Sequence, residues 1–474
     1  MHIGNLRTAL YAYLIARHAG GTFVLRIEDT DRKRHVQGAQ QAIYDSLRLA
    51  GLDHDEGPDV GGDYGPYVQS QRKPTYQEHA ERLVASGAAY RCFCAGGQDE
   101  RRQRARVQAQ GALRDPCRSL RRVEAEARAA AGEPHVIRQR IPDKGNTTFV
   151  DHTYGTITFP NDVLDDQVLL KSDGLPTYNF ANVVDDHLMA ITHVVRGVDY
   201  LPSTPKYNLL YQSFGWEVPE YIHVPQIVKE GGKKLSKRAG DASFQDLLAR
   251  GYLAQAIVNY VALLGWSPGD DREFFTLPDL VEAFDFHRIN KSSAGFSMTK
   301  LDWLNGEHLR ALSQEEFAAA ARAFYPPVMA QSLDTARISR LIQSRVVHLT
   351  DIPALVAFFE QVPDYPADLY VASKSRSSLE SSRLVLENIP AILSGLPEWT
   401  SHALAATLVA WGKEHGLKTG TVMWPLRIAL SGLEATPGGA TEIAEVLGHD
   451  ETLRRVASGL AKLTVTPETG QIAT

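Results

Sequence analysis

This sequence has few cysteines, no long apolar segment and no excess of basic residues. Three cysteines in 474 residues argue against a disulfide framework and indicate a reducing compartment. The most apolar stretch, residues 252–266, contains Gln255 and Asn259. It is therefore too short and too polar to span a bilayer, and the N-terminus carries no signal-peptide pattern. We expect a cytoplasmic protein without membrane attachment.

The overall charge says little about partners, because 50 basic and 56 acidic residues leave a net charge of −6. Positive charge is concentrated locally, since nine arginines accompany three acidic residues between Arg91 and Arg122. Such a stretch is typical of contact with nucleic-acid phosphates, and equally of a solvated arginine-rich helix. With 43% hydrophobic and 22% charged residues, the composition is that of a globular protein. Its length allows about three or four domains.

The first motif, His2-Ile3-Gly4-Asn5, stands at the start of the chain. Apolar residues at helical spacing over residues 5–18 predict a helix that ends at Gly20-Gly21, followed by a buried strand over residues 22–27. A small-residue turn that opens a helix exposes backbone N–H groups at the positive end of the helix dipole, where phosphates bind. We expect His2 and Asn5 to add donors there.

The second motif, Lys234-Leu235-Ser236-Lys237-Arg238, lies more than two hundred residues downstream. Lysine side chains are compact charges on flexible stems, suited to following negative charge as a pyrophosphate departs. A pentapeptide of this kind beside Gly231-Gly232 is, by itself, also typical of a solvated loop. The motif gains meaning only in combination with the first one.

Together, and in this order, the two motifs resemble the ATP-binding signatures of class I aminoacyl-tRNA synthetases. The rest of the chain resembles bacterial-type glutamyl-tRNA synthetases over nearly its whole length. The matching segments are residues 25–31 (LRIEDTD), 65–72 (GPYVQSQR), 176–178 (PTY), 182–187 (NVVDDH), 195–197 (VRG), 259–266 (NYVALLGW), 300–306 (KLDWLNG), 424–427 (WPLR) and 436–438 (TPG).

The resemblance implies attachment of L-glutamate to tRNA(Glu) through a glutamyl-adenylate, with ATP and Mg²⁺, by a monomer that has no editing domain. It implies that Glu28 holds the ammonium group of glutamate, that Tyr178 and Arg196 meet its side-chain carboxylate, and that Asn182 belongs to the same site. It assigns catalysis to His2, Asn5, Lys234 and Lys237, ATP binding to these four with Gly4 and Ser236, and tRNA binding to Asp31 and Arg345.

Two alternatives stay open. One is a non-discriminating enzyme that also charges tRNA(Gln), and the other is a truncated, non-catalytic tRNA-binding paralogue. Members of the family begin with a strand and a Pro-Ser-Pro-Thr-Gly loop before the His-Ile-Gly element. We expect that segment about a dozen residues upstream of Met1, at a mis-set start, and we expect weak stability and little activity without it, because a central parallel strand has neighbours on both sides.

Four acidic residues next to the expected site allow two interpretations. Asp29, Asp31, Asp185 and Asp186 form pairs that are typical of metal ligands. At strand ends, such acids more often cap helices or pair with arginines, and we favour that second interpretation.

The three cysteines, Cys92, Cys94 and Cys117, resemble a zinc site that some members of this family carry. Structural zinc takes four ligands, but the position expected to supply the fourth holds Ser119. Asp115 or His135 are the candidate substitutes. We favour three unligated thiols over bound zinc.

The expected fold is an α/β N-terminal half, a class I Rossmann-like parallel sheet with an inserted α+β acceptor-binding domain, followed by all-α stem-contact and anticodon-binding domains. Ser313 and Glu316 predict a helix start. The expected domains are residues 1–78 and 176–230 for the two catalytic halves, 79–175 for the insertion, 231–312 for the stem-contact domain, and 313–375 and 376–474 for the two anticodon-binding domains.

Overall fold

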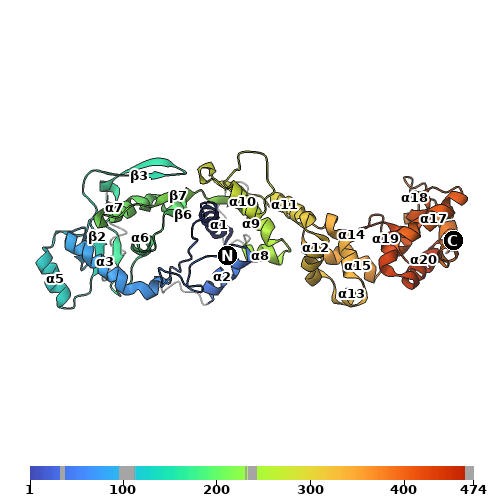
Figure 1. Ribbon diagram of the computed structural model, residues 1–474, viewed down its shortest axis with the longest axis horizontal. Helices are drawn as coiled ribbons and strands as arrows, with labels where there is room; N and C mark the ends of the chain where they lie inside the picture. The colour runs from blue at the N-terminus through green and yellow to red at the C-terminus, as the bar shows by residue number, and fades with distance from the viewer. Residues whose placement is uncertain (32–37, 95–111, 113, 230–231, 233–242, 465–474) are drawn as a thin grey trace, which may run out of the picture. The chain divides into compact units, whose positions relative to one another are not determined.

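The computed structural model describes residues 1–31, 38–94, 112, 114–229, 232 and 243–464. The chain divides into two compact units. The first comprises Met1–Leu247 and Ala254–Met298, and the second comprises Leu248–Leu253 and the described part of Thr299–Thr474. In Figure 1 the colour runs from blue at the N-terminus, through the first unit, to red at the end of the second.

Within the described residues, the first unit combines helices with nine short strands. Its helices are α1 (Ile3–His18), α2 (Ala39–Leu49), α3 (Lys73–Ser86), α5 (Arg122–Ala130), α6 (Tyr178–Leu188), α7 (Thr204–Phe214), α9 (Ala254–Leu263) and α10 (Leu277–Ala283), and α8 (Phe244–Ala249) crosses the boundary between the units. Its strands are β1 (Ala89–Cys92), β2 (Val136–Gln139), β3 (Asn146–Asp151), β4 (Gly155–Pro160), β5 (Val168–Leu170), β6 (His193–Gly197), β7 (Glu220–Val224), β8 (Ile227–Lys229) and β9 (Ala294–Phe296).

The largest sheet has the strand order β4-β3-β7-β6. Strands β6 and β7 run parallel, and their register places Arg196 directly opposite His223. Strand β3 joins the other side of β7 in parallel through the pair Asp151 and Tyr221, and it forms an antiparallel hairpin with β4. Strands β3 and β4, which lie within residues 79–175, thus continue the sheet that carries Arg196.

A second sheet, in the order β1-β2-β5, is antiparallel. Helix α3 packs against it, and together with α6 and α7 it encloses a core that includes Tyr76, Leu83, Leu169, Phe180 and Leu210. Figure 1 shows α3, α6 and α7 close to these strands. This core fixes α6 beside the strand end that leads into it.

Helix α1 confirms the helix predicted over residues 5–18, although it begins two residues earlier. Its buried positions lie on one side, and Arg7 and Tyr11 anchor that side by donating to backbone carbonyls at the end of α9. The Nη1 atom of Arg7 lies 2.9 Å from the carbonyl oxygen of Leu264, and the Tyr11 hydroxyl lies 2.9 Å from that of Ala262. These two polar side chains hold α1 against the end of α9.

The buried strand predicted over residues 22–27 is wrong as a continuous strand. This segment makes only isolated parallel bridges, from Val24 to Glu56 and from Ile27 to Val68. Its partners are separated by a loop containing Gly61 and Gly62, both with positive φ, so the partner backbone turns away between the two bridges. The segment nevertheless directs Arg26 and Glu28 toward the α6 region.

The second unit is helical. Its helices are α11 (Met298–Ala311), which begins at the boundary residue, α12 (Gln314–Ala321), α13 (Pro327–Ser332), α14 (Thr335–Ile342), α15 (Ile352–Glu360), α16 (Leu379–Leu393), α17 (Ser401–Glu414), α18 (Thr419–Ser431), α19 (Ala440–Leu447) and α20 (His449–Thr464). The helix start predicted at Ser313 is confirmed, because Ser313 and Glu316 form a capping box in front of α12.

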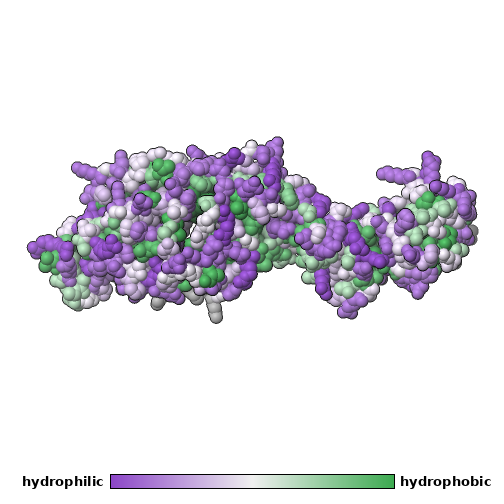
Figure 2. Space-filling view, viewed as in Figure 1, coloured by the Kyte–Doolittle hydropathy of each residue, from purple (hydrophilic) through white to green (hydrophobic). Residues whose placement is uncertain are grey.

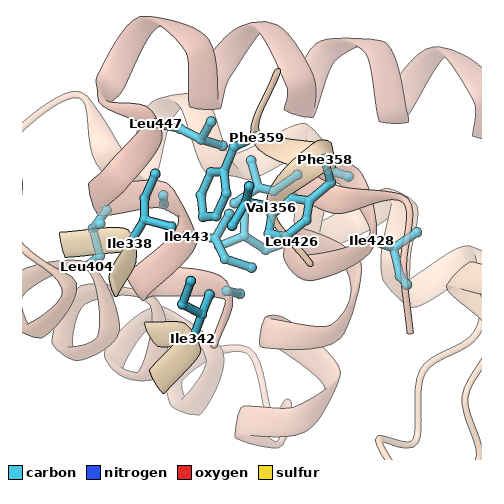
Figure 3. Close-up of a cluster of buried hydrophobic side chains, with 14 of the residues drawn as sticks. Ile338, Ile342, Val356, Phe358, Phe359, Leu404, Leu426, Ile428, Ile443 and Leu447 are labelled. Carbon is cyan, nitrogen blue, oxygen red and sulfur yellow. The ribbon is translucent and has the colours of Figure 1, made fainter. Parts of the chain in front are cut away.

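One apolar core runs through both of the expected anticodon-binding bundles. Ile338 and Ile342 of α14 and Phe359 of α15 share it with Ile443 and Leu447 of α19, as Figure 3 shows. The buried Arg455 of α20 connects this helix to the ends of α15 and α18. It donates to the carbonyl oxygens of Phe358, Phe359 and Leu430, each at 2.7 Å, which satisfies carbonyls that a helix end leaves without partners.

Polar residues cover most of the face drawn in Figure 2, with small apolar patches between them. No single helix in the described ranges combines the length and apolarity required to cross a bilayer. Residues 335–345 and 349–360 meet that criterion only as a pair bent by 116°, and their apolar side chains belong to the core of Figure 3.

His308 of α11 predicts acid sensitivity of the second unit. Burial lowers the pKa of this imidazole from 6.5 to about 4, so the unfolded chain takes up a proton before the native one does. The resulting stabilisation is present above pH 6.5 and is lost as the pH falls toward 4. Between pH 7 and pH 5 the loss amounts to about 2 kcal/mol.

We expect His308→Gln to remove this pH dependence from the free energy of unfolding, measured by urea denaturation of the full chain at both pH values. His402→Gln, at an exposed position of the same unit, is the matched control and should leave the dependence unchanged. An equal loss of stability between pH 7 and pH 5 in the wild type and His308→Gln contradicts the prediction.

Candidate functional site

The first motif forms the N-terminus of α1. His2 is the N-cap residue, and its Nδ1 atom accepts a hydrogen bond from the backbone N–H of Gly4 at 3.0 Å. The imidazole is thus folded over the first turn of the helix, where backbone N–H groups and the helix dipole favour an anion. Asn5 is exposed on the same turn.

Ser243, five residues after the second motif in the sequence, is bonded to the first motif. Ser243 forms an antiparallel bridge with His2, and the backbone N–H of Phe244 donates to the carbonyl of Met1 at 2.8 Å. Lys234, Ser236 and Lys237 themselves lie outside the described residues. The chain segment that carries them therefore ends beside the N-cap of α1.

The paired acids of the expected site are bound to arginines. Arg26 donates from Nη2 to Asp186 at 2.8 Å, and Arg72 donates from Nε to Asp185 at 2.8 Å. Asp185 also accepts from the hydroxyl of Tyr76 at 2.7 Å. This confirms the arginine-pairing interpretation for Asp185 and Asp186.

Asp29 and Asp31 lie at the end of the segment that carries Glu28. Asp29 accepts from the backbone N–H and the hydroxyl of Ser70, at 2.8 and 2.6 Å. Asp31 is exposed. Neither belongs to a group of side chains arranged to bind a metal within the described ranges.

Glu28, Tyr178 and Asn182 come together around the start of α6. Thr177 fixes that start, because its hydroxyl donates to the carbonyl of Val168 at 2.7 Å. Burial raises the pKa of the Tyr178 phenol, the Glu28 carboxylate adds to the rise, and the Arg196 guanidinium opposes it. One turn along α6, the buried side-chain oxygen of Asn182 has no hydrogen-bond partner among the described residues.

Glu28 is the negative end of this group. Its side chain is 33% exposed, and one of its oxygens lies 3.2 Å from Nη2 of Arg26. Arg26 is shared with Asp186, its closer partner at 2.8 Å. The carboxylate of Glu28 is consequently held in place and remains open to solvent.

Arg196 is the positive end, and it differs from the other buried arginines of the site. Only 7% of its surface is exposed, yet its hydrogen bonds go to neutral groups, Nε2 of His223 and the hydroxyl of Thr204, both at 3.1 Å. Within the described part of the chain, no carboxylate forms an ion pair with it. Three aromatic rings surround the guanidinium, those of Tyr207, Tyr221 and Tyr200, at 4.6, 5.2 and 5.9 Å from their centroids.

A buried guanidinium without a negative partner is costly. Cation–π contacts and hydrogen bonds to neutral acceptors offset part of the cost. The remaining positive charge makes the position a strong site for an anionic ligand, and its fork-shaped donors match a carboxylate.

Several residues of this site were not predicted from the sequence. Arg26, Asp151, Thr204, Tyr207 and His223 all contact or hold the expected residues. No local pattern marks them, because they come from separate strands and helices that meet only in the folded sheet. Of these five residues, only Arg26 lies in a matched segment, residues 25–31, which also contains Glu28.

The three cysteines gather at the end of β1 in the second sheet. Their sulfur atoms lie within 4.8 Å of one another, and those of Cys94 and Cys117 are 3.4 Å apart. Neither proposed fourth ligand joins them. Asp115 is paired with Arg138 at 3.1 Å, and His135 packs against the ring of Phe93. The residues can supply three of the four ligands of a zinc site.

The described arginines of the basic stretch are largely paired with acids. Arg118 lies 2.7 Å from the buried Asp166, and Arg91 is bound to Glu81. Residues 95–111, with most of the remaining arginines, lie outside the described ranges. Arg345 is exposed at the end of a short 3₁₀ helix, Gln343–Arg345.

Comparison with known proteins finds two family matches. Residues 1–303 match the family described as "tRNA synthetases class I (E and Q), catalytic domain", and residues 316–460 match the family described as "Anticodon binding domain". The two matches fall largely in the first and second units.

Relatives are similar over the full length. The glutamate–tRNA ligase of Clostridium tetani is 52% identical over 468 residues, which cover 98% of this chain and 95% of that protein. The glutamate–tRNA ligase of Clostridium acetobutylicum is 51% identical over 470 residues, with 98% and 96% covered. A crystal structure of a glutamate tRNA ligase from Elizabethkingia meningosepticum, in complex with its amino acid, superimposes with a TM-score of 0.84 at 32% identity, covering 98% of this chain and 97% of that one.

The cysteine cluster predicts a steep pH dependence of zinc binding. Burial raises the pKa of Cys92 to about 11 and that of Cys94 to about 12, so zinc must displace protons from these thiols at neutral pH. If two protons are displaced, the apparent affinity rises about 100-fold from pH 7 to pH 8.

Competition with a chromophoric chelator measures this dependence in the full chain. Cys117→Ser should weaken zinc binding at least about 100-fold, because it removes one of three sulfur ligands. Ser119→Ala, at the position without a ligand, is the matched control. Binding that does not change with pH, or that survives Cys117→Ser, contradicts a site made by these thiols.

Proposed function

The chain belongs to the class I tRNA synthetases for glutamate and glutamine, and from this membership we propose that it attaches L-glutamate to tRNA(Glu) with ATP. The observation that carries the proposal is the buried, uncompensated charge of Arg196, which lies near the carboxylate of Glu28 and the phenol of Tyr178. A positive and a negative group on two sides of one site suit an amino acid with a carboxylate side chain.

Arg196 is the proposed partner of the side-chain carboxylate of glutamate, with Tyr178 beside it. Glutamine carries no charge at this position, so its binding leaves a buried guanidinium without a counter-charge. A site built in this way rejects the neutral analogue by roughly 10⁴-fold without a separate editing step.

Glu28 is the proposed partner of the ammonium group. Its carboxylate is open to solvent and already oriented by Arg26. The unpartnered oxygen of Asn182 is an acceptor in the same region and suits an N–H donor of the substrate. Assigned this way, the α-carboxylate of glutamate remains free to react.

ATP is proposed to bind at the start of α1. His2, Gly4 and Asn5 present the first turn of the helix to the phosphates, and Ser243, a few residues after the lysine motif in the sequence, is bridged to His2. Lys234, Ser236 and Lys237 then act on the β- and γ-phosphates as pyrophosphate leaves. Mg²⁺ supplies additional positive charge when it is bound with ATP.

The reaction follows from these positions. The α-carboxylate of glutamate attacks the α-phosphorus of ATP, pyrophosphate departs, and a terminal ribose hydroxyl of the tRNA then takes the glutamyl group from the adenylate. The protein contributes alignment and positive charge, and no protein base is required. Asp31 and Arg345 are the proposed contacts to the acceptor end and the anticodon. We propose that the chain acts as a monomer in the cytoplasm.

Arg196→Gln tests the glutamate site. The variant keeps a polar side chain but loses the charged fork, so the Kd for L-glutamate and its KM in aminoacylation should rise about 100-fold, equivalent to about 3 kcal/mol. Calorimetric titration and initial rates measure the two constants.

Arg122→Gln is the matched control, since Arg122 is an exposed arginine paired with Glu126. It should leave both constants within twofold of the wild type. Unchanged glutamate binding in Arg196→Gln rules out the proposed role of Arg196.

Gly4→Ala tests the ATP site. A Cβ atom at Gly4 would lie 3.2 Å from Nδ1 of His2, so the imidazole has to shift by a few tenths of an ångström from its position over the first turn of α1. The KM for ATP should rise about 10-fold, because a misplaced donor loses about one hydrogen bond, while the KM for glutamate stays unchanged.

Gly21→Ala is the matched control, because its Cβ meets the carbonyl of Ala16 at an ordinary 3.5 Å. Equal values of the KM for ATP in the two variants contradict an ATP site at this turn.

A further inference from the structure

One edge of the Arg196 guanidinium is held by buried groups from three elements, β3, β7 and α7. Its Nε atom donates to Nε2 of His223 on β7, and Nδ1 of His223 lies 2.6 Å from Oδ2 of Asp151 on β3. Its Nη2 atom donates to the hydroxyl oxygen of Thr204 on α7. Asp151, Thr204 and His223 are each no more than 1% exposed.

The direction of these hydrogen bonds fixes the tautomer of His223. An arginine Nε can only donate, so Nε2 of His223 must be the acceptor, and its ring proton is on Nδ1. That proton is donated to Asp151. The same argument makes His223 neutral, and burial, together with the adjacent Arg196, lowers its pKa, while Asp151 opposes the shift.

Asp151 is itself held at the end of the β3–β4 hairpin. Its Oδ1 atom accepts from the backbone N–H groups of Thr153 and Tyr154, at 3.0 and 2.8 Å, and its Oδ2 atom also accepts from the backbone N–H of His223 at 3.1 Å. The carboxylate therefore cannot rotate without losing several hydrogen bonds. Its position determines the plane of the imidazole.

Because its hydrogen-bond acceptors are neutral, they do not compensate the positive charge of Arg196. Arg26 and Arg72 bond directly to carboxylates, which compensate them. At Arg196, the imidazole of His223 stands between the guanidinium and Asp151, and among the described residues no carboxylate bonds to the guanidinium directly, so the arginine is oriented by neutral acceptors. The hydrogen bonds use Nε–H and one Nη2–H, which form one edge of the guanidinium, and the Nη1 end of the fork stays available.

We propose that Asp151, His223 and Thr204 are positioning residues that aim the Nη1–Nη2 edge of Arg196 at the substrate carboxylate while leaving its charge uncompensated. This inference rests on the proposed role of Arg196 in glutamate binding. It adds three residues that determine specificity through Arg196 without touching the substrate themselves.

Two substitutions of His223 separate positioning from packing. In His223→Gln, the Oε1 atom can occupy the place of Nε2 and accept from Nε of Arg196. In His223→Leu, a side chain of similar volume offers no acceptor. We expect the KM and Kd for glutamate to rise at least 10-fold in His223→Leu and to stay within about threefold of the wild type in His223→Gln. The KM for ATP should change by less than twofold in both.

Thr204→Val provides a second test that does not depend on folding of the leucine variant. It removes the acceptor for Nη2, together with the contacts of the same hydroxyl to the carbonyl of Tyr200 at 3.1 Å and to Nε2 of His223 at 3.3 Å, from a side chain of nearly the same shape, and it should raise the KM for glutamate about threefold to 10-fold. Thermal unfolding of each full-length variant reports any structural effect. Ser213→Ala, at a hydroxyl of the same helix bonded to the carbonyl of Leu209, is the matched control.

The outcomes distinguish the two proposals. A glutamate-specific rise in KM for His223→Leu and Thr204→Val, with rescue in His223→Gln, supports positioning. Equal effects of leucine and glutamine, or a change in melting temperature without a change in glutamate KM, overturn it. If Arg196→Gln also leaves glutamate binding unchanged, the result contradicts the proposed role of Arg196 in glutamate binding. The positioning role of Asp151, His223 and Thr204 is then contradicted as well.

Discussion

The guanidinium of Arg196 is buried with only neutral groups bonded to it, and residues of β3, β7 and α7 hold it there. Removing such a charge from water costs several kcal/mol unless other groups compensate for it. Tyrosines from β7, α7 and the adjoining turn supply their ring faces, and His223 and Thr204 supply acceptors. The register of β6 and β7, which sets Arg196 opposite His223, is what makes both contributions possible.

Elsewhere in the site, buried acidic side chains form ion pairs with arginines of the same protein. Asp185 and Asp186 are bound to Arg72 and Arg26, and this network holds α6 against the segment that carries Glu28. Arg196 is left as the uncompensated positive group, and Glu28 as the partly exposed negative one. Such a division of charge orients an amino acid by its two ends, and it relates the chemistry of the site to the packing of α6 against α3, α7 and β5.

The second unit achieves its stability by a different route. One apolar core connects α14 and α15 with α19 (Figure 3). At its edge, Arg455 donates hydrogen bonds to three backbone carbonyls. Here the arginine also pairs with Glu451 of its own helix at 2.6 Å, so its charge is compensated within the protein, as is appropriate for a structural position. The family matches assign this unit to anticodon binding and the first unit to catalysis, so the two cores support separate parts of one task.

Local patterns in the sequence correctly predicted the features that depend on neighbouring residues. Helix α1 and the capping box of Ser313 both follow from short-range spacing and hydrogen bonding. The segment 22–27 was predicted less well, since apolar composition favours an extended backbone but does not supply strands to pair with it. Arginine pairing of Asp185 and Asp186 was also anticipated, whereas their partners were not.

The sequence by itself determined the family resemblance, the helical second half and the residue types of the site, because these reside in short motifs and local periodicity. Only the tertiary structure decided that the 147–159 segment is a hairpin in the main sheet, that Asp115 and His135 stand apart from the three cysteines, and that Asp151 and His223 lie behind Arg196. Residues 151, 196 and 223 are far apart along the chain. They meet because parallel strands bring distant positions into register, and no local pattern encodes that register.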